Sequence, residues 1–353
     1  MTARDWREHI VPLDQTAAAA ARERIDNLTK PLRSLGRIEE LAVQLCAIGG
    51  CVPEHAYERR AILVGAGDHG VAEAGVSAYP AEVTAQMVAG FLAETAAISA
   101  FARAVRADVY VANFGVRTPL AAHARLLDVH CGYATANLAR RAAIPRADLG
   151  YVLAAGIAAF DEVMERSPFD VLALGEMGIA NTTSAAAIVA AFTGKSVPSV
   201  VGRGTGIDDE RFAHKVNVVE RALSRIQDFT WEQIASEVGG YEIVGLAGVI
   251  LTAARARVPV VLDGFIVAAA ALIAGAIAPH ALDYCIAAHR SREPGHALAL
   301  EALGLRPLFD LDLALGEATG AALALPLIEA AARMVREMRT FEEAGVATKE
   351  PPR

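Results

Sequence analysis

Residues 169–193 constrain the fold most strongly, because the sequence changes there from one secondary-structure pattern to another. A short apolar run leads to a turn containing Gly175 and Gly178, and an alanine-rich segment follows. This order predicts a buried strand, a loop and the start of a helix. Glycines let backbone N–H groups approach a ligand closely, and a helix N-terminus favours anions. The segment indicates a phosphate-binding loop, although an ordinary connection capped by Asn181 or Thr182 has the same pattern.

Short apolar runs alternate with helical segments through most of the chain. We expect strands at residues 61–64, 107–112, 169–174, 199–201 and 258–262. Such alternation implies right-handed crossovers, so the prediction is an α/β fold with a Rossmann-like parallel sheet and helices on both faces. A small hairpin is expected within residues 126–135 and one helix at 81–105. Asp208 or Asp209 is well suited to cap the helix that follows it.

The helices at the two chain ends have no predicted strand to cover. We therefore expect residues 1–50 and 300–353, approximately, to form a small helical domain. The large α/β domain is expected at about 60–290. All 353 residues would then form a single catalytic unit.

Composition and charge exclude several classes of partner. The formal charge of −8 and the absence of a basic run argue against nucleic acid. The first eight residues lack the apolar region of a signal peptide, and the apolar stretch 258–278 is divided by Asp263 into a strand and a short helix. The four cysteines include no C-x-x-C pair, so they are expected to be reduced thiols. These features predict a cytoplasmic protein without membrane contact.

Four loops leave predicted strands and carry glycines with polar residues, at 65–70, 175–183, 202–209 and 263–264. In parallel sheets, ligands gather at the carboxyl ends of the strands, so these loops are expected to share one site. None is a Walker A loop, and residues 202–206 lack the dinucleotide fingerprint. Asp68, His69 and His289 raise the alternative of a metal-dependent hydrolase, but no histidine-rich spacing supports it. We predict no metal and no cofactor.

Several motifs, in a constant order from about residue 30 to 346, carry a family resemblance. They include Gly67-Asp68-His69-Gly70-Val71 and Leu315-Gly316-Glu317, together with segments at 30–37, 75–87, 175–183, 202–209, 262–265 and 289–296. The chain resembles the nicotinate-nucleotide–dimethylbenzimidazole phosphoribosyltransferases. The resemblance implies transfer of phosphoribose from nicotinate mononucleotide to 5,6-dimethylbenzimidazole, giving alpha-ribazole 5'-phosphate and nicotinate during cobalamin nucleotide-loop assembly. It also implies a cytoplasmic homodimer.

The resemblance also implies roles for individual residues. Glu317 matches the general base, which chemistry requires because the attacking benzimidazole nitrogen gains nucleophilicity as the other ring nitrogen loses its proton. Glu176 and Asp263 are candidates for stabilising positive charge at the anomeric carbon. Lys215 matches a phosphate-binding lysine. The expected substrate-binding residues are Ser77, Tyr79, Gln86, Gly175, Met177, Gly178, Asn181, Thr182, Gly202, Gly204, Thr205, Gly206, Lys215, Ser291, Leu315 and Gly316.

The sequence departs from the family pattern at a few positions. Ala180 replaces a common third glycine in the 175–183 loop, and Asn113 replaces a more usual aspartate. Two alternatives stay open from the residues: the same reaction on another lower-ligand base, and a catalytically silent partner subunit. Hydrophobic pockets discriminate between similar bases by only about 1–3 kcal/mol, so the sequence does not select one.

Overall fold

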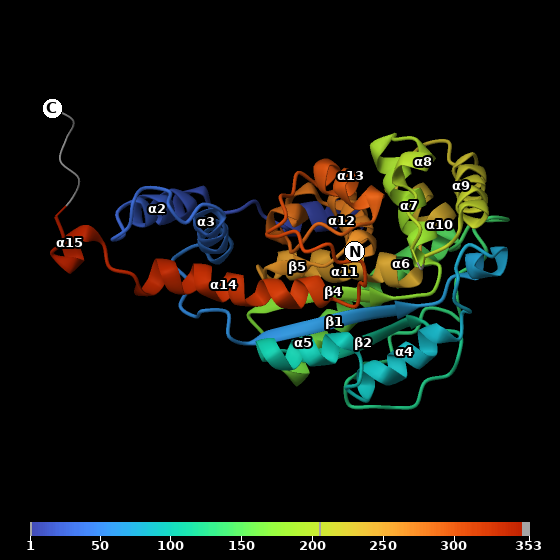
Figure 1. Ribbon diagram of the computed structural model, residues 1–353, viewed down its shortest axis with the longest axis horizontal. Helices are drawn as coiled ribbons and strands as arrows, with labels where there is room; N and C mark the ends of the chain where they lie inside the picture. The colour runs from blue at the N-terminus through green and yellow to red at the C-terminus, as the bar shows by residue number, and fades with distance from the viewer. Residues whose placement is uncertain (1, 205, 348–353) are drawn as a thin grey trace. The chain divides into compact units, whose positions relative to one another are not determined.

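A computed structural model describes residues 2–204 and 206–347 and confirms the predicted α/β fold. Its six-stranded sheet has the order β3-β2-β1-β4-β5-β6, and every neighbouring pair is parallel. The central strands β1 and β4 are almost entirely buried, as expected where helices cover both faces of a parallel sheet. Figure 1 shows α4 and α5 on one side of the sheet and α6, α11 and α12 on the other. The strands are β1 Arg60–Gly67, β2 Asp108–Gly115, β3 Leu126–Leu127, β4 Val171–Met177, β5 Val260–Leu262 and β6 Cys285–Ala287.

Most helices connect the strands, and others belong to a smaller compact unit that is described below. The α-helices are α1 Ala3–His9, α2 Gln15–Asp26, α3 Arg37–Gly49, α4 Val83–Leu92, α5 Ala97–Val105, α6 Leu149–Arg166, α7 Asn181–Thr193, α8 Val197–Val200, α9 Asp209–Leu223, α10 Trp231–Val238, α11 Tyr241–Arg255, α12 Phe265–Ile277, α13 Pro294–Leu303, α14 Thr319–Glu337 and α15 Phe341–Ala344. The short 3₁₀ helices are η1 Gly70–Ala74, η2 Arg146–Asp148 and η3 Pro279–Tyr284.

The ends of two helices test the predicted caps. Asp208 caps α9 as predicted, because its side chain accepts a hydrogen bond from the backbone N–H of Arg211 at 2.8 Å. The alternative interpretation of this segment, an ordinary connection capped by Asn181 or Thr182, is wrong about the cap. The cap position is Ala180, which has a left-handed backbone with φ 72° and makes no side-chain cap hydrogen bond.

Three sequence-based assignments are also wrong. Residues 199–201 are not a strand. They form the end of the short helix α8 and its cap, because Pro198 in the first turn of α8 favours helical φ. The expected hairpin at 126–135 is replaced by the two-residue strand β3, which pairs parallel to β2. The expected single helix at 81–105 is two helices, α4 and α5, separated at residues 93–96, where Glu94 has φ 58°.

This break also bears on membrane crossing. The stretch Val83–Val105 is long and apolar enough to span a membrane by length and composition, with a hydropathy of 1.4. Each of its two helices is too short to do so alone. Strand β6, Cys285–Ala287, was not among the predicted strands.

The chain forms two compact units. The larger contains Met1–Val11 and Arg59–Ala324, and the smaller contains Pro12–Glu58 and Leu325–Arg353. The smaller unit therefore lacks residues 1–11 and 300–324, which the sequence-based division placed in it. Within this unit the two parts of the chain meet, since the backbone N–H of Thr29 donates to the carbonyl of Arg339 at 3.0 Å. All candidate site residues lie in the larger unit.

Candidate active site

A cavity of about 360 Å³ lies at the carboxyl ends of the strands, where ligands bind in parallel sheets. Its wall includes the end of β4, the N-terminus of α7, the start of α12 and the segment that precedes α14. Twelve of the predicted site residues line it: Ser77, Tyr79, Glu176, Met177, Gly178, Asn181, Thr182, Gly204, Ser291, Leu315, Gly316 and Glu317.

The other predicted residues stand behind this wall or away from it. Asp263 and Lys215 are buried beside lining residues and are described below. Gly175 lies under the Glu317 segment, and Gly202 lies against Glu293. Gln86 is exposed on α4, Gly206 is exposed, and neither lines the cavity. Thr205 lies outside the described residues.

Glu317 sits in a strained turn. Gly316, Glu317 and Ala318 all have left-handed backbones, with φ of 85°, 61° and 68°. For Glu317 and Ala318 this conformation costs about 1–2 kcal/mol each, so the surrounding structure must hold it. Gly175 makes room for the turn, because a Cβ there would overlap the backbone nitrogen of Ala318. The contacts that hold this turn therefore set the position of the Glu317 carboxylate at the cavity wall.

Asp263 supports that turn with two hydrogen bonds. Its Oδ2 accepts a hydrogen bond from the backbone N–H of Ala318 at 3.1 Å, and its Oδ1 accepts one from Ala321 at 2.9 Å. The side chain of Asp263 is buried and does not line the cavity. These contacts are those of a carboxylate that caps the start of α14 and holds the Glu317 turn.

The carboxylate of Glu317 is suited to receive a proton. Its Oε2 is buried and has no hydrogen-bond partner among the described residues. Burial raises the pKa of Glu317, a backbone hydrogen bond from Ile98 lowers it, and the nearby charge of Asp263 raises it again. The net direction is upward, so burial outweighs the backbone hydrogen bond. A carboxyl group with a raised pKa is a stronger base than an exposed one.

Glu176 lines the same cavity and is also buried, with its Oε1 next to Gly316. Desolvation raises its pKa to about 8, against the opposing hydrogen bond that the Asn181 amide donates to its Oε2. The charges of Glu242, Asp263 and Glu317 contribute to this raised value. Without substrate, Glu176 is therefore mostly protonated at neutral pH.

Behind the end of the cavity formed by Thr182 and Gly204 lies a buried cation. Lys215 is 1% exposed, and its Nζ donates to Thr182 Oγ1 at 2.8 Å and to the Gly202 carbonyl at 3.2 Å. Burial lowers the pKa of Lys215 to about 8, while the charge of Glu293 raises it. Thr182 belongs to the first turn of α7, where backbone N–H groups favour anions. This end of the cavity fits a phosphate.

Several further side chains complete the site. The sequence predicts no role for Glu293 or Glu242. It raises His69 and His289 only as possible metal ligands. Glu293 and His289 line the cavity. His289 Nε2 lies 3.5 Å from Asp263 Oδ1. Under the glycine loop, the Nε2 of His69 lies 2.6 Å from Glu242 Oε1, and both side chains are fully buried. The motifs at 67–71 and 289–296 were the only signal for these residues, and motifs do not reveal the contacts between them.

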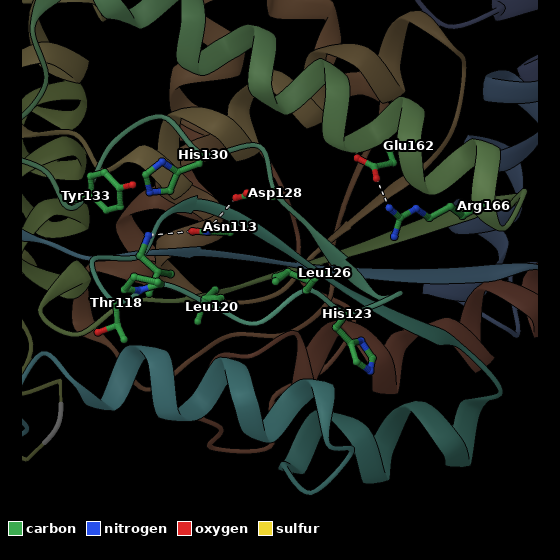
Figure 2. A pocket seen from close by; sticks show the side chains of 13 residues that line it. Asn113, Thr118, Leu120, His123, Leu126, Asp128, His130, Tyr133, Glu162 and Arg166 are labelled. Atoms are coloured by element: carbon green, nitrogen blue, oxygen red, sulfur yellow. Dashed lines mark hydrogen bonds and ion pairs between the residues drawn. The ribbon is translucent and has the colours of Figure 1, made fainter.

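A larger cavity of about 550 Å³ lies elsewhere, beside β3 and α6 (Figure 2). Four of its polar side chains form two pairs: the Asn113 amide donates to Asp128 Oδ1 at 3.2 Å, and Arg166 pairs with Glu162. It contains none of the predicted site residues. The smaller cavity is therefore the better candidate, because buried carboxylates and a buried lysine converge on it.

Comparison with known proteins gives a consistent result. A family model described as phosphoribosyltransferase matches residues 10–346. A protein from Chloroflexus aggregans is 51% identical over 343 residues, covering 97% of both chains, and one from Deinococcus radiodurans is 48% identical over 349 residues, covering 97% of this chain and 95% of its own. Both are named nicotinate-nucleotide–dimethylbenzimidazole phosphoribosyltransferase. The crystal structure of CobT from Thermus thermophilus aligns with a TM-score of 0.91 at 49% identity, covering 95% of this chain and all of that one.

Proposed function

Because this chain belongs to the phosphoribosyltransferase family, we propose that it transfers phosphoribose from nicotinate mononucleotide to 5,6-dimethylbenzimidazole. The products are alpha-ribazole 5'-phosphate and nicotinate. One observation carries the proposal at the level of chemistry: a buried carboxylate with a free oxygen, Glu317, and a buried lysine beside a helix N-terminus line or adjoin one cavity.

The proposed reaction begins with Glu317 as general base. Its free Oε2 takes the proton from one benzimidazole nitrogen, while the other nitrogen attacks the anomeric carbon of the ribose. The bond between that carbon and the pyridinium nitrogen breaks, and its electron pair stays on the departing nicotinate. The phosphate is held at the other end of the cavity by Lys215 and the first turn of α7.

The two remaining carboxylates have different proposed roles. Asp263 acts as a positioning residue, since both of its oxygens accept backbone hydrogen bonds that fix the Glu317 turn. Glu176 faces the cavity and is the better candidate to stabilise positive charge on the ribose. Entry of a cationic pyridinium would favour the ionised form of Glu176 and so lower its raised pKa.

A chromatographic assay tests the proposal. Purified protein is incubated with nicotinate mononucleotide and a panel of benzimidazoles, adenine and phenolic bases, and both nicotinate and riboside phosphate are quantified. We expect release of nicotinate in a 1:1 ratio with riboside formation. The panel then ranks the acceptors, which the apolar wall at Tyr79, Met177 and Leu315 discriminates only weakly. Folded protein that releases no nicotinate with any base would instead be a silent partner subunit.

We further propose that the protein acts as a homodimer in the cytoplasm. Tyr79 and Leu315 are 55% and 57% exposed at the cavity, and exposed large apolar side chains favour a covering partner. The four cysteines are thiols that form no disulfide, which fits a reducing compartment. Light scattering should give twice the mass of one chain, and cell fractionation should recover the protein with cytoplasmic markers.

A further inference from the structure

We propose that the Glu293 carboxylate occupies the phosphate end of the cavity when no substrate is bound and competes with the incoming phosphate. The inference deepens the proposed function and rests on it for the identity of the phosphate ester. It assigns Glu293 a role in setting affinity for the phosphate group. Glu293 would be neither a base nor a phosphate ligand.

The contacts of Glu293 are those expected of a bound anion. Its Oε1 accepts a hydrogen bond from the backbone N–H of Gly204 at 3.1 Å. Its Oε2 lies against Gly202, where a Cβ would overlap it, and has no hydrogen-bond partner among the described residues. The glycine loop thus receives a carboxylate from its own chain in the way that such loops receive phosphate oxygens.

Glu293 is also a counter-charge for the buried lysine. Lys215 is almost fully buried, and the charge of Glu293 counteracts the lowering of its pKa. A buried ammonium group without an anion nearby is costly, so a nearby carboxylate stabilises the site before substrate binds. A substrate phosphate would supply the same negative charge at this end of the cavity.

The Glu293 carboxylate and a substrate phosphate cannot both occupy this end of the cavity. A phosphate dianion bound to Gly204 N–H and near Lys215 would meet the Glu293 carboxylate at close range, and like charges in a buried site repel strongly. Substrate binding therefore requires Glu293 to turn away or to take up a proton. Its return after the reaction would help the product phosphate to leave.

The test removes the charge and measures the binding of a dianion directly. Sulfate is the probe, because it remains a dianion throughout the working pH range. Isothermal titration of the full-length protein compares wild type with Glu293→Gln and Glu293→Ala, and kinetics give KM and kcat for nicotinate mononucleotide. We expect sulfate to bind about tenfold more tightly to both variants, which corresponds to about 1.4 kcal/mol. KM for nicotinate mononucleotide should fall by a similar factor, and kcat should not rise.

Two controls separate competition from structural damage. Glu301→Gln removes an exposed carboxylate from α13, the helix that begins directly after Glu293, and should leave sulfate binding unchanged. Nicotinate riboside lacks the phosphate, so its inhibition constant should be the same in wild type and the Glu293 variants. A general loosening of the site would change the binding of both sulfate and nicotinate riboside.

Sulfate binding that is unchanged or weaker in both Glu293 variants overturns the inference. This outcome is separate from the proposed function. Normal turnover by the wild type with unimproved sulfate binding in the variants rejects the role of Glu293 alone. No turnover, but tighter sulfate binding in the variants, rejects the transferase and leaves the competing carboxylate in place.

Discussion

Asp263 Oδ2 accepts a hydrogen bond from the backbone N–H of Ala318 at 3.1 Å, directly after the candidate general base. This bond joins the carboxyl end of β5 to the left-handed turn at residues 316–318. The turn is strained, so its geometry depends on such bonds. The position of Glu317 is therefore set by a side chain that does not line the cavity.

Replacing Asp263 by Asn should lower both activity and stability. The asparagine amide offers one acceptor oxygen, so one of the two backbone N–H groups, of Ala318 or Ala321, loses its bond. A buried donor without a partner costs about 1–3 kcal/mol. Because the Glu317 turn loosens, kcat should fall by about 10²-fold. Urea denaturation and steady-state kinetics measure the two effects.

The control is Asp161→Asn, an exposed position on α6, which should change neither quantity. An Asp263→Asn protein with normal kcat would show that the turn holds Glu317 without this bond.

Replacing Glu317 by Gln should remove the general base and reduce kcat by about 10²–10⁴-fold. In the wild type, the base must be ionised, and burial raises its pKa. The rate should therefore rise with pH through a value above that of an ordinary glutamate, and this acid limb should be absent from the residual activity of the variant. The pH dependence of kcat/KM for the benzimidazole measures it. If the Glu317→Gln protein keeps this rise of rate with pH, the rise belongs to the titration of another group.

Replacing Gly175 by Ala should disrupt the site through packing alone. The new methyl group would overlap the Ala318 backbone nitrogen and lie 2.6 Å from the Ala318 Cβ, so the turn must move. Overpacking of this kind costs about 1–3 kcal/mol, and we expect kcat to fall with it. Gly150→Ala is the matched control. It lies in the first turn of α6 with open space around its Cβ position, and it should be neutral or slightly stabilising.

The sequence predicted the fold where apolar runs are long and glycine loops follow them. Strands β1 and β4 were identified because their runs are buried along nearly their whole length. Strand β6 has three residues, and residues 199–201 look strand-like although Pro198 favours the helix α8. Local patterns of this length do not distinguish strand from helix.

The site was predictable to a similar degree. The motifs identified most of the residues that line the cavity, because loops at the carboxyl ends of parallel strands lie at one edge of the sheet. They did not reveal that Asp263 holds the Glu317 turn or that Glu293 meets Gly204, 89 residues away in sequence. Glu242 and His69 are separated by 173 residues. Contacts between distant segments follow from tertiary packing, which periodicity and spacing do not encode.

Glu176 should make the folded state less stable as the pH rises. Its pKa in the unfolded chain is close to the ordinary value of 4.5, and its folded pKa is raised to about 8. Between these values the unfolded chain has released a proton that the folded chain retains, so stability falls with pH and the loss is complete above the folded pKa. The penalty is on the order of 5 kcal/mol. Glu176→Gln removes it and keeps an acceptor for the Asn181 amide.

Urea denaturation at about pH 5 and about pH 9 measures this effect. The variant and the wild type should differ little at the lower pH, and the variant should be the more stable at the higher one. If the free energies of unfolding of the variant and the wild type differ by the same amount at both pH values, Glu176 is ionised in the folded protein.

Replacing Ala180 by Gly should stabilise the protein slightly. Ala180 has φ 72° at the cap of α7, and a left-handed backbone costs an alanine about 1–2 kcal/mol. Glycine removes this strain but gives the unfolded chain more freedom, which costs about 0.4–1 kcal/mol. The strain is the larger effect, so the free energy of unfolding should rise by roughly 0.5–1 kcal/mol, as the difference of those two ranges. Ala190→Gly, inside the same helix, should instead destabilise by about 1 kcal/mol. A loss of stability in Ala180→Gly would mean that the loop is held in this conformation without measurable strain.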